Sequence, residues 1–123
     1  MKIQTVNPAT EQILQSYDCL NEQEAHELIN KGHEVYLTWR KTPFSKRKTL
    51  MLQLAQLLKS KVDELARLMS TEMGKPITAS RAEINKCAWL CEYYAEHAEE
   101  YLAPKIVQTE MKKAKVCHLP LGI

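Results

Sequence analysis

Apolar side chains recur at helical spacing in three long segments, and this pattern constrains the fold more than any other feature of the sequence. The segments are residues 21–42, 45–73 and 77–102. They end at Thr42-Pro43, at Gly74 with Pro76, and at Pro104. Proline cannot continue a helix, and glycine accepts the left-handed backbone that commonly follows a helical C-terminus. The chain is therefore predicted to be mainly helical.

Capping signals refine the ends of these helices. Asn21 and Glu24 have the spacing of a capping box at the start of the first helix, and Ser45 is predicted to be the N-cap of the second. If it continued unbroken to residue 73, the second helix would be about 40 Å long. Because that length is large for a small domain, we expect a bend or a short break near Ser60.

The third helix is predicted to bury one face. The residues on or near that face are Ala82, Cys87, Leu90, Cys91, Tyr94, Ala98 and Tyr101. Tyr93 and Tyr94, together with Trp89, are an alternative stacking platform. Adjacent helical residues point in different directions, so we expect Tyr94 in the core and Tyr93 at a contact.

Short extended segments flank the helices. Residues 1–18 place apolar residues on both sides of Asn7-Pro8-Ala9-Thr10, a turn signal, and predict a β-hairpin. Residues 105–109 and 114–119 are predicted to be strands separated by a polar stretch. The predicted fold class is thus mainly α with short β-hairpins at both ends, α+β by content.

Composition and charge exclude several functional classes. The 3 glycines, Gly32, Gly74 and Gly122, are too far apart for a glycine-rich phosphate loop. A net charge of +2 does not indicate a nucleic-acid partner. No segment approaches the ~20 apolar residues of a membrane span, and no signal peptide is recognisable. Basic residues cluster over 35–62 and glutamates over 92–110; we favour a solvated helix face that pairs with the acidic stretch over an anion site.

Four cysteines in a chain without a recognisable export signal predict reduced thiols and a cytoplasmic protein. Cys87 and Cys91 lie one helical turn apart and, with His97 or His118, form an alternative metal site. Only two of these ligands have suitable spacing, so we favour cysteines that pack as small apolar residues. A nucleophilic cysteine needs a base and an oxyanion site, and neither is recognisable nearby. No metal ligand and no catalytic residue is assigned.

The order of motifs along the whole chain resembles one known family. The motifs are Asn7-Pro8-Ala9-Thr10, Trp39-Arg40, a long leucine-rich helix, Glu72-Met73-Gly74-Lys75-Pro76, Tyr93-Tyr94-Ala95-Glu96 and Pro120-Leu121-Gly122-Ile123. In this order and at these intervals they resemble the N-terminal part of the aldehyde dehydrogenase superfamily. Lys86-Cys87-Ala88, followed by Cys91 and Tyr93, is most similar to the bacterial succinate-semialdehyde dehydrogenase branch.

The resemblance implies the N-terminal portion of an α/β doubly wound fold whose sheet is mostly absent from this chain. It also implies a much longer enzyme, which oxidises a small aldehyde to a carboxylic acid through a cysteine thiohemiacetal with NAD or NADP as cofactor. The family's nucleophilic cysteine, glutamate base and cofactor-binding residues have no counterpart in this sequence. As a truncated fragment, the chain is therefore expected to bind no cofactor and to be inactive alone.

The resemblance further implies a division of the chain. Residues 1–103 would hold the N-terminal hairpin and helices of the incomplete cofactor-binding domain. Residues 104–123 would hold strands of an oligomerisation segment, with homo-oligomer contacts through residues 105–120. The alternative, from another functional class, is a small helical self-associating interaction module without enzyme activity.

One candidate site comes with the resemblance. In the family, the helix that follows the equivalent of Pro76 forms a wall of the substrate entrance, and this places Ala82, Lys86 and Trp89 near that entrance. A lysine there would attract a carboxylate substrate such as succinate semialdehyde. The alternative for Lys86 is an ordinary solvated lysine.

Overall fold

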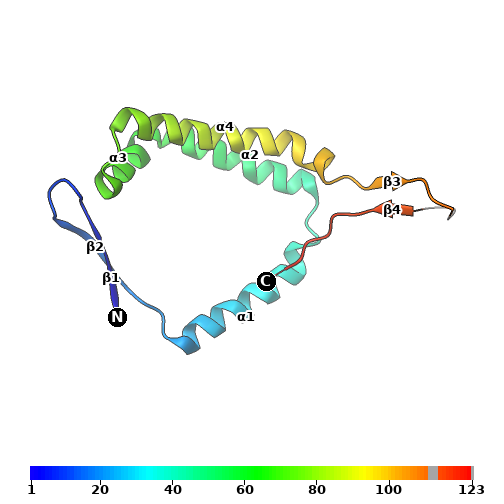
Figure 1. Ribbon diagram of the computed structural model, residues 1–123, viewed down its shortest axis with the longest axis horizontal. Helices are drawn as coiled ribbons and strands as arrows, with labels where there is room; N and C mark the ends of the chain where they lie inside the picture. The colour runs from blue at the N-terminus through cyan, green and yellow to red at the C-terminus, as the bar shows by residue number, and fades with distance from the viewer. Residues whose placement is uncertain (111–113, 123) are drawn as a thin grey trace.

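A computed structural model describes residues 1–110 and 114–122 of the chain. Its elements, in chain order, are β1 (Lys2–Val6), β2 (Ile13–Asp18), α1 (Glu22–Trp39), α2 (Phe44–Ser60), α3 (Val62–Met73), α4 (Ile77–Tyr101), β3 (Lys105–Val107) and β4 (Ala114–Val116). Figure 1 shows that α4 lies along α2, whereas α1 runs apart from this pair. The C-terminal segment returns to the junction between α1 and α2. The expectation of a mainly helical chain with a hairpin at each end is confirmed.

Both predicted hairpins are present. Strands β1 and β2 pair antiparallel with a bulge between Thr5 and Val6, and β3 pairs antiparallel with β4. The second hairpin is shorter than predicted, because its strands cover only Lys105–Val107 and Ala114–Val116. In Figure 1 this hairpin is an arm that extends from the helices, and no other described strand pairs with it. A two-stranded ribbon gains little from pairing alone, so only three residues of each strand pair.

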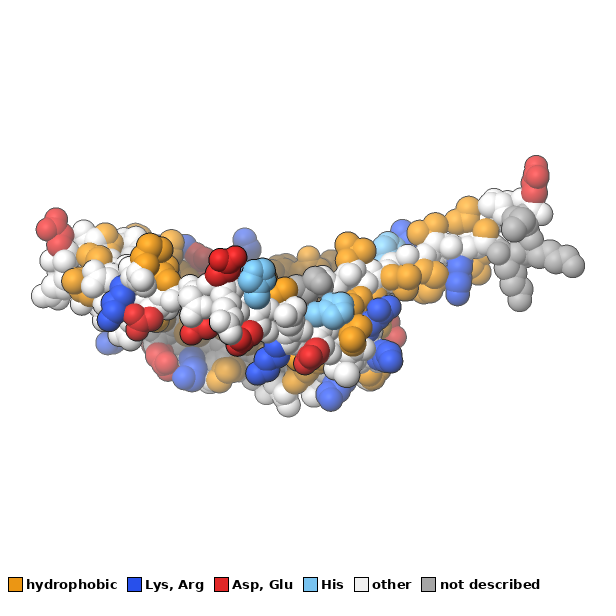
Figure 2. All heavy atoms as spheres, turned by 90° about the horizontal axis from the view of Figure 1, so that it is seen from below, with side chains coloured by type: hydrophobic (Ala, Val, Ile, Leu, Met, Phe, Trp, Pro, Cys, Tyr) orange, Lys and Arg blue, Asp and Glu red, His pale blue; other side chains and the backbone are white. Residues whose placement is uncertain are grey.

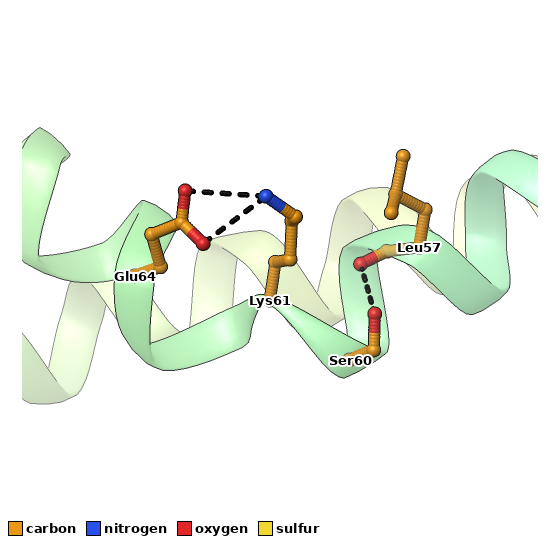
Figure 3. Close-up of polar contacts among 4 residues, drawn as sticks. All are labelled: Leu57, Ser60, Lys61 and Glu64. Atoms are coloured by element: carbon orange, nitrogen blue, oxygen red, sulfur yellow. Dashed lines mark hydrogen bonds and ion pairs between the residues drawn. The ribbon is translucent and has the colours of Figure 1, made fainter.

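The predicted interruption of the long second helix lies at Lys61, between α2 and α3. Lys61 has φ −109° and ψ 18°, outside the helical region. Figure 3 shows the local contacts: the Ser60 hydroxyl donates to the Leu57 carbonyl oxygen, and the Lys61 ammonium binds the Glu64 carboxylate. A serine hydroxyl that bonds back to a preceding carbonyl competes with the backbone ladder and bends helices. The break is therefore encoded locally.

The expected helix caps are confirmed at α1 and corrected at α2. Asn21 and Glu24 form a complete capping box. The N-cap of α2 is Pro43, however, and Ser45 lies inside the helix, where its carbonyl oxygen accepts from the Thr49 hydroxyl. Proline fixes φ near the value required at this position and has no N–H to satisfy, so the helix begins directly after it.

The buried face of α4 differs from the predicted one. Its buried residues are Ser80, Ile84, Ala88 and Ala95, and they face α2 and α3, where Ala55 and Ala66 are fully buried. Cys87 and Leu90 are exposed instead. The predicted buried face contained large side chains, whereas small side chains let helix axes approach closely. The core of the described chain is thus a seam of small residues.

The prediction that Tyr94 lies in the core is also wrong. Its side chain is 47% exposed and is not in the core. Tyr93 is partly buried and packs against neighbouring aromatic rings on its own helix. The closely packed alanine seam leaves no space for a phenol ring, so both tyrosines lie outside it.

Gly74, at the end of α3, contacts the N-terminal hairpin. It has φ +70° at the end of α3, which confirms the expected left-handed conformation. A Cβ atom on Gly74 would lie 3.0 Å from Cγ of Pro8, in the β1–β2 turn. The turn therefore packs directly on the backbone between α3 and α4.

None of the helices in the described parts of the chain has the length and apolarity of a membrane span.

Candidate functional site

The outward face of α4 carries the three residues predicted to lie near a substrate entrance. Ala82, Lys86 and Trp89 are all exposed, and their spacing of four and three residues puts them on one face of the helix. This face is opposite the Ser80, Ala88 and Ala95 seam. The structure thus brings the three residues together on one surface. Their role at an entrance stays a prediction, because an entrance needs a facing wall.

Lys86 is available to bind an anion. It forms no ion pair with any described residue, whereas the neighbouring Glu83 carboxylate is engaged by Lys75. Lys86 also borders a shallow surface hollow of about 410 Å³ with Ala82 and Cys87. An unpaired ammonium beside apolar surface suits a small ligand with a carboxylate at one end.

A column of aromatic rings continues this face toward the end of α4. The Trp89 and Tyr93 ring centroids are 5.7 Å apart, and the His97 ring stacks on Tyr93 at 4.4 Å and 13°. The Tyr93 and Tyr101 hydroxyls are hydrogen-bonded to each other. The predicted stacking platform included only Trp89, Tyr93 and Tyr94. The i, i+4 recurrence of rings at 89, 93, 97 and 101 is the signal that would have identified the column.

The hydrogen-bonded pair of Tyr93 and Tyr101 shifts the pKa of Tyr101. The hydrogen bond that Tyr101 shares with Tyr93 raises the pKa of Tyr101 above its ordinary value of about 10, and desolvation and the charges of Tyr93 and Glu100 act in the same direction. The bond favours the neutral phenol because ionised Tyr101 cannot donate a proton.

The variant Tyr93→Phe is expected to lower the pKa of Tyr101 toward its ordinary value, because the largest cause of the shift is removed. An NMR titration of the tyrosine ring carbons measures this change. The matched control is Tyr94→Phe, which removes an adjacent phenol but leaves the Tyr93–Tyr101 bond intact. An unchanged Tyr101 pKa in Tyr93→Phe would show that the hydrogen bond does not govern it.

Opposite charges pair between neighbouring helices, and one of these pairs, Lys59–Glu92, joins the basic stretch to the acidic one. The Lys59 ammonium lies 2.6 Å from the Glu92 carboxylate and links α2 to α4. Arg81 lies 2.7 Å from Asp63 and links α4 to α3. Exposed pairs of this kind contribute little to stability, so their main effect is to orient the helices.

The remaining chemically reactive groups do not form a catalytic centre within residues 1–110 and 114–122. Cys87 is exposed, Cys91 is partly buried, and both are free thiols. No group of three or more metal-ligating side chains is present in these ranges. The two glycines with positive φ, Gly74 and Gly122, lie close to the side chains of Pro8 and Tyr36, respectively.

Comparison with known proteins gives consistent sequence matches. The aldehyde dehydrogenase family matches residues 1–123. The chain is 38% identical over its full length to a Synechocystis sp. protein named "Probable succinate-semialdehyde dehydrogenase [NADP(+)]", and 33% identical over 97% of its length to the succinate-semialdehyde dehydrogenase [NADP(+)] of Deinococcus radiodurans. It spans only 27% and 25% of these relatives, respectively.

Solved structures match the fold over the same part. The succinic semialdehyde dehydrogenase of Streptococcus pyogenes, crystallised with NADP+, aligns with a TM-score of 0.86 and 30% identity over 93% of this chain and 25% of its own. The structure of Gox0499 aligns with a TM-score of 0.93 and 31% identity over 98% of this chain and 27% of its own. In both cases the match falls on the N-terminal part of the larger protein.

Proposed function

The chain belongs to the aldehyde dehydrogenase family, and on that basis we propose that it supplies the N-terminal helical part of an enzyme that oxidises succinate semialdehyde to succinate with NADP+. The observation that carries the proposal is the alignment of nearly the whole chain, at a TM-score of 0.86, with the Streptococcus pyogenes enzyme. The 38% and 33% identities to two NADP+-linked relatives support the same substrate and cofactor. NADP+ would be the hydride acceptor. No binding site for it is identified among the described residues of this chain.

The outward face of α4 is the proposed contribution of this chain to substrate binding. Lys86 would attract the carboxylate of succinate semialdehyde, because its ammonium has no competing ion pair among the described residues. Trp89, one helical turn away, is 56% exposed and would form an apolar wall for the methylene carbons. Ala82 leaves space for the ligand on the other side of Lys86. These residues bind and position substrate and take no part in bond breaking.

We further propose the division at residues 103 and 104 and a role for the second hairpin in assembly. Residues 1–103 would form part of a cofactor-binding domain, and residues 105–120 would join two copies of the chain. The support is that β3 and β4 extend from the helices as an arm (Figure 1) and that Ile106 is 88% exposed. A cytoplasmic location is supported by four free cysteines.

A second candidate function is a small self-associating interaction module. It is favoured by one observation, the large apolar side chains that the described helices leave exposed, such as Leu57 and Leu68. The two functions differ in a measurable way. The helical part of an enzyme restores activity when it replaces its counterpart in a relative, whereas an independent module does not.

A chimera tests the proposal directly. The 119 aligned residues replace their counterparts in the Deinococcus radiodurans enzyme, and a second chimera uses the Synechocystis relative. We expect at least one chimera to reduce NADP+ with succinate semialdehyde, whereas the 123-residue chain alone gives no turnover. Inactive or unfolded chimeras with both hosts would contradict the assignment, and turnover by the chain alone would contradict its lack of catalytic residues.

The same chimera tests Lys86. The variant Lys86→Met is expected to raise KM for succinate semialdehyde about tenfold, the effect of losing one charge-assisted contact, and to leave KM for butanal unchanged. Lys86→Arg, which keeps the charge, is the control and should stay close to the parent. Equal changes in KM for both aldehydes would show that Lys86 does not recognise the carboxylate.

A further inference from the structure

A cavity at the junction of α1, α2 and the C-terminal segment gathers two arginines and a histidine from distant parts of the sequence. It has a volume of about 390 Å³, and Arg40, Arg47 and His118 line it. Figure 1 shows the C-terminal segment returning to this junction, which is how His118 reaches residues almost eighty positions earlier. No aspartate or glutamate lines the cavity. It shares no residue with the hollow beside Lys86.

Tyr36 holds two walls of this cavity in place. Its hydroxyl donates to the carbonyl oxygen of Pro120 at 2.9 Å, and Gly122 packs against its ring. The guanidinium carbon of Arg40 lies 5.3 Å from the centroid of the same ring. One aromatic side chain thus fixes both the arginine on α1 and the segment that carries His118. Positions fixed in advance reduce the entropy cost of binding a ligand.

The Arg47 side chain is held by a separate set of contacts, with Thr42 and Trp39. Its Nε donates to the Thr42 carbonyl oxygen at 3.1 Å and its Nη2 to the Trp39 carbonyl oxygen at 3.0 Å. Its guanidinium carbon also lies 5.3 Å from the Trp39 ring centroid. These contacts are with neutral groups, and neither Arg40 nor Arg47 forms an ion pair with a described residue. Arg47 also borders a neighbouring hollow that Glu96 and Glu99 line. Guanidinium groups have the fork geometry that matches phosphate oxygens.

Apart from Thr42, the rest of the lining is apolar and defines the other end of a ligand. Phe44, Leu102, Leu119 and Pro120 complete the walls. We propose that this cavity binds a small organic phosphate monoester, with the phosphate between Arg40, Arg47 and His118 and the organic group against the apolar walls. The proposal does not rest on the aldehyde dehydrogenase activity.

Calorimetric titration of the 123-residue chain with phenyl phosphate tests the proposal, with inorganic phosphate as a second probe and sodium chloride at matched ionic strength as the salt control. We expect saturable binding of phenyl phosphate, weaker binding of inorganic phosphate, and none with chloride. Arg40→Gln should weaken phenyl phosphate binding about tenfold or more, because a charge-assisted hydrogen bond is lost. His118→Gln should weaken it to a smaller degree.

Two further variants separate the site from general charge effects. Arg67→Gln removes an arginine on the exposed surface of α3 and is expected to bind like the parent. Tyr36→Phe keeps every charge but loses the bond to Pro120, and is expected to weaken binding while far-UV circular dichroism stays unchanged. Equal affinity in the parent and Arg40→Gln, or an equal loss in Arg67→Gln, would overturn the proposal. Inorganic phosphate binding as tightly as phenyl phosphate would overturn the role of the apolar walls.

Discussion

Purified 123-residue chain is expected to self-associate at micromolar concentrations, with a mass from light scattering that rises with concentration. Its accessible surface is 10360 Å², whereas a folded monomer of 123 residues is expected to expose roughly 6,800 Å². Large apolar side chains contribute to this exposed surface: Leu50, Leu54, Leu57 and Leu68 are each more than two fifths exposed. Apolar patches of this extent are unusual on monomers, so a second copy is expected to cover part of this surface.

The second hairpin adds an exposed strand edge to this apolar surface. Ile106 in β3 is 88% exposed and Val116 in β4 is 52% exposed. Figure 2 shows hydrophobic side chains along the surface of the extended arm. Unpaired edges are templates for pairing with another chain, and the arm is far enough from the helices for a second copy to reach it.

The contribution of the arm is measured with the variant Ile106→Lys. It places a charge on the exposed strand and is expected to lower the average mass at a given concentration, because lysine on an edge opposes pairing between chains. Gln108→Lys adds the same charge two residues away, in the loop beyond β3, and is expected to have a smaller effect. A single sharp monomer mass for the parent chain at all concentrations would contradict the prediction.

The variant Ala88→Leu is expected to have the largest effect on stability. Ala88 is completely buried in the seam where α4 packs on α2 and α3, and the extra carbons of leucine force the helices apart. Overpacking of this kind costs about 1–3 kcal/mol. Because the seam is most of the buried core, we expect the thermal midpoint, followed by circular dichroism, to fall by roughly 5 °C or more.

Ala82→Leu is the matched control for this experiment. It makes the same substitution on the same helix, but Ala82 is exposed on the outward face. Surface substitutions away from special features usually change the free energy of unfolding by less than about 0.5 kcal/mol. Equal thermal midpoints for Ala88→Leu and Ala82→Leu would mean that the alanine seam is not closely packed in solution.

Local features of this protein were determined by its sequence. The capping box at Asn21, the break near Ser60, the left-handed Gly74 and the two hairpins each depend on residues close together in the chain. Hydrogen bonds across three or four residues, proline geometry and glycine conformation act within one helical turn or one β-turn. The pattern of residues therefore predicts them without knowledge of the neighbouring elements.

Only the tertiary structure decided which helix faces are buried and which residues meet. Periodicity placed Tyr94 and Leu90 inside, but the buried seam consists of small residues such as Ala88 and Ala95 because α4 approaches α2 closely. The cavity that joins Arg40 to His118 depends on where the C-terminal segment crosses the α1–α2 junction. The physical reason is that burial and long-range proximity depend on how whole helices pack, and a periodic pattern of residues gives a face its polarity without specifying its partner.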